Sequence, residues 1–411
     1  MKLNSIILIK VIFIFFLNKQ FSQYEDLPNN IKTVILKTTN STAPFINFDE
    51  LIELSFDDLE SDEKTYYYQI NHFDYKWISS NLPKSDYLDG FDDLRIKEYR
   101  NSFNTLKSYS HYKLTIPNDD VSLKISGNYS ISIHLSSGER IFEKKFSIIK
   151  NNVPVQISVS KSNIISNIQT NQKIKVIINC GDCTSLYNSS SKLKIIIIKN
   201  NNWTNSQIIE KPKYVLSNKL IYDNIVFKGG NEFLNFDNSN INSTNIKIFK
   251  TKLTDLYNNY LRSDKERTKL FYEYNPDING EYVINSNKSY DIDVENDYAR
   301  IYFDFQTDIY DHNKKIYLLG KFNNFNVNEN YKLEYDDQTK SYKGSFLFKQ
   351  GFYNYKYGYT SLLNNYELQY FEGDFWKTEN TFTVLLYQKK INEKYFKIIG
   401  SQSISSKNIK N

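Results

Sequence analysis

The segment that decides the fold class is "NYSISIHLSSGERIFEKKFSII", Asn128 to Ile149. In its two halves, "NYSISIHL" (Asn128–Leu135) and "RIFEKKFSII" (Arg140–Ile149), apolar residues recur at alternate positions, which is the period of a strand with one buried face. The connection "SSGE" (Ser136–Glu139) is short and contains a glycine, as hairpin loops commonly do. The segment therefore predicts two antiparallel strands that share one side of a hydrophobic core.

Similar strand-like segments recur about every ten residues along the chain, separated by clusters of Asn, Asp, Ser and Gly. This spacing predicts an all-β protein built of tandem immunoglobulin-like β-sandwiches. The 34 Tyr and 28 Phe suit such sheets, because aromatic rings cover large apolar areas on a half-buried face. At 411 residues the chain is long enough for about three domains, and we place them at residues 28–150, 151–290 and 297–400.

The first 22 residues have the pattern of a secretory signal peptide. Lys2 and Lys10 precede the apolar run "VIFIFFL" (Val11–Leu17), and a polar stretch with a small residue near Ser22 provides a cleavage point. The alternative is an uncleaved membrane anchor, but the apolar run is shorter than the roughly 20 residues of a membrane-spanning helix. We therefore expect an exported, soluble protein with residues 1–22 removed.

The charge balance excludes nucleic acid as a partner. The formal net charge is +5, and it falls to about +2 when the three lysines of the signal peptide are removed. Binding to phosphate backbones requires a concentrated basic face, and no segment carries a run of basic residues. No apolar run after the signal peptide is long enough to span a bilayer, so we expect no direct insertion into the membrane.

The two cysteines, Cys180 and Cys183, lie in the segment "CGDC". In an oxidising compartment such a pair can close a local disulfide at a hairpin tip. Free thiols and a redox-active pair are the alternatives, but redox activity requires a helix N-terminus beside a βαβ unit, and here a polar loop follows. We favour the disulfide, and two cysteines without nearby histidines do not make a zinc site.

No catalytic motif is present, and we expect no enzymatic activity. The four histidines are far apart in sequence, and neither a nucleophile elbow nor a metalloprotease or phosphate-binding motif occurs. The carboxylate pair Asp57–Asp58 lies in a polar cluster of the kind found in solvated turns, as do similar pairs elsewhere. The segment "NPDING" (Asn275–Gly280) begins like a calcium loop, but its twelfth position is Ser286 instead of Glu, so a turn is favoured and no metal or other cofactor is expected.

The segment from Ile316 to Tyr359 resembles an early-set domain of the glycogen-binding type, in its order of strand, "GKFNNF", strand and "KQGFYNYKY". Members of that class commonly stack a Trp on sugar at the position where this chain has Phe325. Trp376 and many tyrosines remain as platforms on which a sugar could stack. An exported glycan-binding protein is therefore the alternative function, although glycan binding is not favoured.

Several segments together are similar to the plug protein of the type IX secretion system of Bacteroidetes. The resemblance covers nearly the whole chain after the signal peptide, with the segments in the same order. They are Lys84–Asn118, Ser126–Ile133, Asn201–Gln207, "FKGGNEFLNFD" (Phe227–Asp237), "PDINGEYVI" (Pro276–Ile284), the "GKFNNF" segment and "TENTFTVLLY" (Thr378–Tyr387). The glycine pair and the "DING" turn are not generic features of β-proteins.

This resemblance implies a function. Plug proteins are non-catalytic periplasmic proteins that bind a giant outer-membrane β-barrel translocon and close its periplasmic opening when no substrate passes. The resemblance thus implies a protein-transport role without a cofactor, in the periplasm, at the outer membrane through the barrel partner. An interface that must release its partner should be polar and moderate in area.

The segment Ser85–Tyr112 is dense in aromatic and charged residues without regular periodicity. One interpretation is a partner-binding surface of aromatic anchors ringed by charge. The other, which we favour, is a long crossover between strands whose aromatics cap the first core. The candidate partner-binding residues are Tyr87, Leu88, Phe91, Arg95, Tyr99, Arg100, Phe103 and Tyr109.

Overall fold

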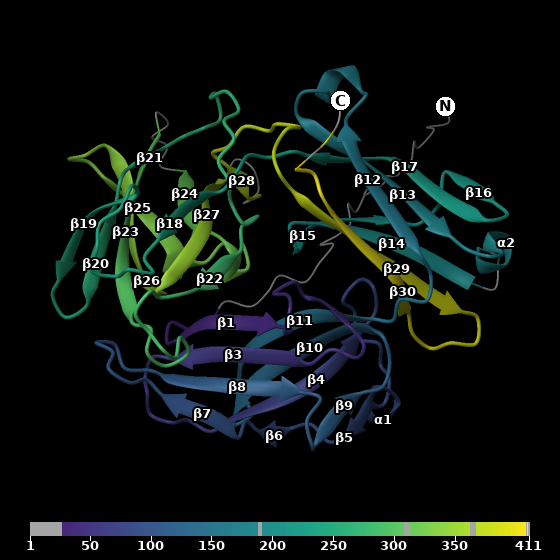
Figure 1. The fold of residues 1–411 in the computed structure, drawn as a ribbon, viewed down its shortest axis with the longest axis horizontal. Coiled ribbons are helices and arrows are strands. Elements are labelled where there is room, and N and C mark those ends of the chain that lie inside the picture. Colours follow the sequence, from purple (N-terminus) through teal and green to yellow (C-terminus); the bar gives the residue numbers. More distant parts are fainter. Residues whose placement is uncertain (1–26, 188–190, 308–312, 362–366, 408, 410–411) are drawn as a thin grey trace, which may run out of the picture.

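The computed structural model describes residues 27–187, 191–307, 313–361, 367–407 and 409. Figure 1 shows three β-rich units packed around a common centre. We call them the first domain (27–150), the second domain (151–230 with 379–407) and the third domain (231–378). Nearly every regular element is a strand, so the all-β prediction is confirmed. The expected signal peptide, residues 1–22, lies outside the described residues.

The first domain is a sandwich of two sheets. One sheet has the order β1 (Ile31–Lys37), β3 (Ile52–Asp58), β8 (Ser110–Ile116), β7 (Glu98–Asn101); the other has the order β2 (Phe45–Asn47), β11 (Arg140–Ile149), β10 (Gly127–Leu135), β4 (Tyr66–Phe73), β6 (Leu94–Arg95). The predicted hairpin is β10–β11, which pairs antiparallel from Gly127–Ile148 onward. Alternate residues of β4 are buried between the sheets, as the period of two requires.

The crossover from β4 to β8 and the β8–β10 connection carry short elements, namely α1 (Lys84–Tyr87), β5 (Leu88–Gly90) and β9 (Val121–Leu123). Strands β5 and β9 pair with each other at one end of the first sandwich. Strand β7 lies at the opposite end (Figure 1). The crossover therefore extends along the whole length of the first domain.

The second domain is also a two-sheet sandwich. Its sheets have the orders β12 (Val155–Lys161), β13 (Asn171–Asn179), β17 (Lys219–Lys228), β16 (Tyr214–Leu216), and β15 (Asn202–Ile209), β14 (Ser191–Lys199), β29 (Thr381–Lys390), β30 (Lys397–Ser405). The 3-10 helix η1 (Ile165–Asn167) lies between β12 and β13, and α2 (Cys183–Leu186) follows β13.

The third domain is one continuous path of strands. Its order is β18 (Leu234–Asp237), β27 (Gly351–Ser361), β24 (Lys314–Leu319), β25 (Lys332–Asp336), β26 (Ser341–Lys349), β23 (Tyr298–Gln306), β20 (Tyr257–Leu261), β19 (Ile248–Leu253), with β21 (Asp264–Lys265), β22 (Tyr282–Ile284) and β28 (Gln369–Tyr370) beside it; the short helices are η2 (Lys321–Asn323) and η3 (Glu329–Tyr331). Phe236 on β18 packs against Phe303 and Phe348 from the other part of the path. The path therefore folds over an aromatic core.

The sheets divide the chain differently from the expected units at 151–290 and 297–400. Strands β29 and β30 complete the second domain, although they follow the third domain in sequence. The physical reason is that β14 and β29 are both apolar on two faces. Ile195 and Ile197 point into the core of the second domain, while Ile196 and Ile198 pack with Trp77 against the first domain. Two such strands bury their faces best as central neighbours in one sheet.

The two rings considered as sugar platforms in the third domain are largely buried. Phe325 is 8% exposed and packs beside Phe233, while Trp376 is 9% exposed with the Lys161 amine over its ring. Neither ring therefore presents a free face on which a sugar can stack. These two rings therefore do not provide the sugar-binding surface that the resemblance to early-set domains suggested.

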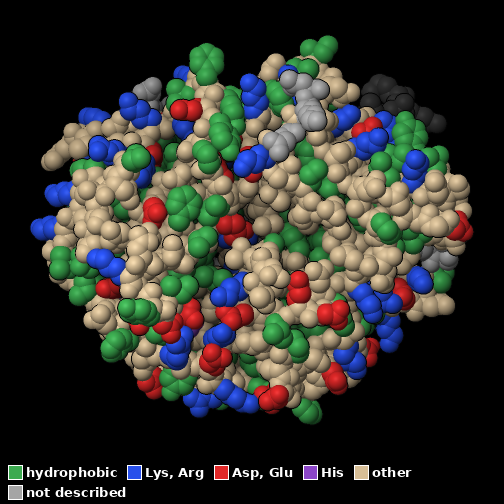
Figure 2. Space-filling model, viewed as in Figure 1, with side chains coloured by type: hydrophobic (Ala, Val, Ile, Leu, Met, Phe, Trp, Pro, Cys, Tyr) green, Lys and Arg blue, Asp and Glu red, His purple; other side chains and the backbone are tan. Residues whose placement is uncertain are grey.

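The described helices are all too short and polar to cross a bilayer. Figure 2 shows charged side chains of both signs across the face in view, with hydrophobic side chains scattered among them.

Candidate functional site

The structure divides the eight candidate residues of the crossover into two groups. Tyr87, Leu88 and Phe91 lie at the β5 end of the first domain, where Tyr87 and Leu88 are buried and Phe91 is 79% exposed. Arg95 is exposed on the edge strand β6. The remaining four lie toward the β7 end, and they are Tyr99, Arg100, Phe103 and Tyr109. The eight residues do not form one continuous surface, and the second group leads to the joint with the third domain.

At that joint, which we call joint 1, a buried carboxylate gathers three donors from two domains. Asp57 on β3 accepts hydrogen bonds from His111 Nδ1 at 2.6 Å, Tyr298 Oη at 2.6 Å and Lys349 Nζ at 2.8 Å. Tyr298 and Lys349 belong to the third domain. The side chains of Asp57 and Lys349 are 0% and 1% exposed, so this ion pair is shielded from water.

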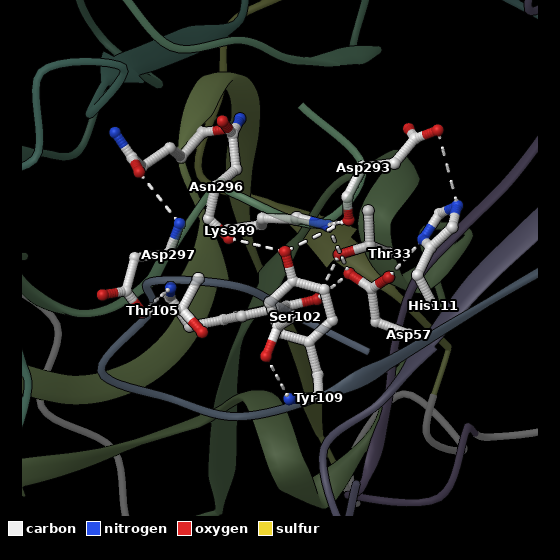
Figure 3. A network of polar contacts seen from close by, with 12 residues as sticks. Thr33, Asp57, Ser102, Thr105, Tyr109, His111, Asp293, Asn296, Asp297 and Lys349 are labelled. Atoms are coloured by element: carbon white, nitrogen blue, oxygen red, sulfur yellow. Dashed lines mark hydrogen bonds and ion pairs between the residues drawn. The ribbon is translucent and has the colours of Figure 1, made fainter. Parts of the chain in front are cut away.

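Tyr109 completes the centre of joint 1 (Figure 3). Its hydroxyl donates to the Asn296 carbonyl at 2.8 Å, and its ring lies 4.3 Å from the Lys349 amine. Lys349 also donates to the Asp293 carbonyl at 2.7 Å, so its ammonium has two hydrogen-bond acceptors in addition to the Tyr109 ring. The cation–π contact adds to the ion pair because both are desolvated.

The rim of joint 1 is polar. Arg100 pairs with Asp291 and, at 3.3 Å, with Asp293. The Asp297 carboxylate accepts from the backbone N–H groups of Leu106 at 2.7 Å and Lys107 at 3.1 Å. The crossover loop is thereby fastened to the third domain from both sides of the buried centre.

The charged and polar groups at joint 1 fix one another's protonation states. Burial alone raises the pKa of Asp57, but the attraction of Lys349 and the hydrogen bond from His111 outweigh it and keep the pKa below its ordinary value. Burial, followed by the charge of Asp57, raises the pKa of Tyr298 well above 10. Asp57 therefore stays ionised and Tyr298 neutral at physiological pH. Because these groups are enclosed between two domains, the arrangement is suited to holding the first and third domains together.

A second contact, joint 2, lies between the second and third domains at the "FKGGNEF" segment. The Lys199 amine donates to the carbonyls of Lys228 and Gly229, both at 2.7 Å. A Cβ on Gly229 would lie 1.9 Å from the Phe375 carbonyl oxygen, so only glycine allows the two backbones to approach. Lys356 on β27 donates to the Asn231 carbonyl at 2.5 Å. Close packing thus explains Gly229, whereas Gly230 is explained by its φ of +72°, a conformation that favours glycine.

Joint 2 also contains a buried carboxylate, Glu232, which is 1% exposed. Its Oε1 accepts from the Tyr272 hydroxyl at 2.6 Å and from the Glu379 N–H at 3.1 Å. Arg267 donates to the Glu232 carbonyl at 2.6 Å and to Glu372 at 2.7 Å. Burial raises the pKa of Glu232 despite these hydrogen bonds.

The "NPDING" segment forms a turn at the edge of joint 2. Asp277 accepts from the backbone N–H groups of Phe233 and, at 2.6 Å, Asn279. Asn354 on β27 accepts from the N–H groups of Ile278 at 2.8 Å and Gly280 at 3.1 Å. The Asp277 carboxylate is therefore used by the backbone of the turn.

The most important residue of joint 1 was not recognisable from the sequence. Asp57 and Asp58 were expected in a solvated turn, and this is wrong because both are fully buried at the end of β3. Asp58 accepts from the Tyr66 hydroxyl and from Asn30 Nδ2, each at 2.8 Å. The sequence signal that both aspartates belong to a buried strand was the strand pattern before them, which continues through both residues. His111 and Lys349 are too distant in sequence to be paired with Asp57 without the fold.

The structure joins Cys180 and Cys183 in a disulfide with a Cα–Cα distance of 5.2 Å. The polar loop expected after the pair is a one-turn helix, α2, capped by Asp182 through the Ser185 N–H at 3.0 Å. The bridge closes a local loop at the edge of the second domain, away from both joints.

The buried lysines predict an alkaline optimum of stability. Burial lowers the pKa of Lys32 to about 8 and the pKa values of Lys144 and Lys199 to about 7, from 10.5. Between pH 7 and 10.5 the unfolded chain therefore holds more protons than the folded chain, so stability rises with pH in this window. From pH 7 to 9 we expect the free energy of unfolding, measured in urea titrations, to increase by about 2 kcal/mol for each of Lys144 and Lys199 and by about 1 kcal/mol for Lys32.

The matched variants for this test are Lys144→Met, which removes one buried amine, and Lys340→Met, whose side chain is 69% exposed. The first should reduce the rise in stability between pH 7 and 9 by about 2 kcal/mol, because Lys32 and Lys199 remain, and the second should leave the rise unchanged. A stability that falls over this range would contradict the prediction.

Comparisons with known proteins agree with these features. Residues 31–150 match the family described as "Type 9 secretion system plug protein 1st domain". A crystal structure of a hypothetical protein from Parabacteroides merdae ATCC 43184 superposes with a TM-score of 0.85 and 29% identity, covering 94% of this chain and 100% of that one. No curated protein matches the chain. A structure described as manganese lipoxygenase of Gaeumannomyces graminis with zonadhesin of Komagataella pastoris aligns over 92% of both chains at 6% identity and a TM-score of only 0.16, too low to indicate a shared fold. Residues 31–150 therefore match the first domain of type IX secretion system plug proteins, and nearly the whole chain is similar in structure to the Parabacteroides merdae protein.

Proposed function

We propose that this chain is a non-catalytic periplasmic plug subunit, which binds the outer-membrane β-barrel translocon of the type IX system and closes its periplasmic opening. The first-domain match supports a plug-type role in this system. The observation that carries the finer proposal is joint 1, where the Asp57–Lys349 ion pair is enclosed between two domains.

A body that closes a wide pore must keep its shape, because domains that rotate relative to one another would open gaps around its edge. Adjacent domains move by default unless their interface is extensive or strongly bound. Here joint 1 fastens the first domain to the third, and joint 2 fastens the second to the third. Trp77 of the first domain packs edge-on against Trp203 of the second at 5.0 Å. Each domain is thus held by the other two, which is what a rigid seal requires.

Co-purification tests the association. We expect the tagged full chain to be recovered with the outer-membrane barrel after gentle detergent extraction of cells, and a matched tagged periplasmic protein without plug homology to be recovered without it. A chain that is never recovered with the barrel at any salt concentration or detergent would overturn the proposal.

Permeability tests the sealing role. Deletion of the gene should increase the entry of a large antibiotic such as vancomycin through the outer membrane, while secretion of cargo continues. Expression of the intact chain should restore the barrier. An unchanged barrier in the deletion strain, with the barrel present at its normal level, would contradict closure as the function.

A further inference from the structure

The three domains differ sharply in charge. The second domain, counted over residues 151–230 and 379–411, contains sixteen Lys and only five Asp or Glu. Residues 28–150 contain fifteen basic and eighteen acidic residues, and residues 231–378 contain eighteen and twenty-two. The net charge of the chain is small because one strongly basic domain is balanced by two mildly acidic domains. A molecule with this asymmetry is oriented by the electric field of a charged partner.

Part of this charge lies on one sheet face. In the sheet β12–β13–β17–β16, the alternation that buries Ile174, Val176 and Ile178 turns Lys173 and Lys175 outward on β13. Lys219 begins β17 on the same outward face, opposite Asn179. The other sheet of the domain packs against the first domain through Ile196 and Ile198, so the basic sheet is the free outer layer (Figure 1).

The basic face is poor in acidic partners. Asp223 is shared between Lys173 at 3.6 Å and Lys213 at 3.5 Å. Among the described residues, Lys175 and Lys219 have no acidic partner within ion-pair distance. An excess of positive charge thus remains on the face.

The centre of the same face is apolar. Ile177 on β13 is opposite Ile221 on β17, which is in turn opposite Tyr214 on the edge strand β16. Tyr214 is 52% exposed. An apolar centre with a charged rim is the composition of a protein–protein interface that forms and dissociates. Ile177 and Ile221 are half-buried on the outward face, which suits a facing protein surface better than insertion into lipid.

We propose that the outward face of the sheet β12–β13–β17–β16 docks onto an acidic protein surface at the periplasmic rim of the translocon barrel. This inference rests on the proposed plug function and names the chemistry of the partner. Electrostatic attraction would orient the chain as it approaches, and the apolar strip would then contact the rim. The contact is sensitive to salt, because the lysines are accessible to ions.

The test measures binding of the purified full chain to the purified barrel in detergent at increasing NaCl. We expect Lys173→Glu/Lys175→Glu/Lys219→Glu to weaken affinity at least tenfold at low salt and to flatten the salt dependence. The matched control is Lys252→Glu/Lys288→Glu/Lys340→Glu, which makes the same charge change at exposed positions of the third domain and should bind like the unaltered chain. The neutral triple variant with Gln at residues 173, 175 and 219 should show an intermediate loss, and it replaces the Glu variant if that one melts at a lower temperature.

The outcomes separate the two proposals. If the unaltered chain binds and both charge-reversed variants bind equally well, the docking surface is overturned while the plug function stands. If the unaltered chain does not bind the barrel at any salt concentration, the plug function itself is overturned. If the chain binds vesicles containing phosphatidylglycerol through these lysines and does not bind the barrel through them, the face is a lipid-binding surface and the proposal of a protein partner is overturned.

Discussion

Replacing Asp57 with Asn lowers the free energy of unfolding by about 3–5 kcal/mol, the range measured when one member of a buried ion pair is removed. Lys349 then keeps its ammonium 1% exposed without a counter-charge. The Asn amide also places a donor where Tyr298 and His111 already direct theirs. Chemical denaturation at pH 7 measures the loss.

A matched control is Asp337→Asn, because Asp337 is 82% exposed and pairs with Lys340 at 3.4 Å. That exposed pair should contribute less than about 1 kcal/mol. The double variant Asp57→Asn/Lys349→Met should lose less than the sum of its two single variants, since it leaves no buried charge unpaired. Strict additivity, or a loss equal to that of the control, would show that the pair does not hold joint 1.

The contacts of joint 1 also predict which segments lose protection from amide hydrogen exchange in the Asp57→Asn variant. The crossover loop depends on Asp297, which accepts from Leu106 and Lys107, and on the rim pair between Arg100 and Asp291. In the Asp57→Asn variant, amide hydrogen exchange should therefore increase first at residues 102–109 and 291–297. Exchange in the β10–β11 hairpin should change little, because its strands are centred in the first core.

The limits of prediction from sequence follow from the range of the interactions. The β10–β11 hairpin is a local feature, and its alternation and Gly-containing turn were sufficient to predict it. The partner of β14 was not predictable in this way, because β29 follows nearly two hundred residues later. The run Ile195–Ile198 is apolar at every position and is buried on both faces in the structure, but such a run describes the environment of a strand and not the identity of its neighbour.

The candidate site shows the same contrast between local features, which the sequence predicts, and long-range contacts, which it does not. The aromatic crossover was recognised as a feature with two interpretations, and the structure buries Tyr87, Leu88 and Tyr109 while leaving Phe91 and Phe103 exposed. Asp57 was misjudged because its donors come from β8, β23 and β26, which no local pattern connects. The glycine pair of joint 2 was noticed as specific, but its reasons, the approach of the Phe375 backbone to Gly229 and the positive φ of Gly230, required the fold.

Replacing Gly229 with Ala should lower the free energy of unfolding by about 3 kcal/mol, at the upper end of the usual cost of overpacking. The added Cβ would lie 1.9 Å from the Phe375 carbonyl oxygen and 3.0 Å from the Thr170 carbonyl oxygen, so backbone must move on both sides. That movement breaks the hydrogen bonds from the Phe375 N–H to the Gly230 carbonyl and from the Trp376 N–H to the Gln169 carbonyl. Gly181→Ala is the matched control, because a Cβ there meets nothing within 4 Å and the change should stay within about 0.5 kcal/mol.

The two joints share no residue, so the losses from Asp57→Asn and Gly229→Ala should add within about 0.5 kcal/mol if each joint fastens its own pair of domains. Such additivity is measurable in the double variant by urea unfolding at pH 7. A combined loss well below the sum would mean that opening one joint already releases the other. The three domains would then form a single cooperative unit, and under the proposed sealing function damage to either joint should increase outer-membrane permeability as much as damage to both.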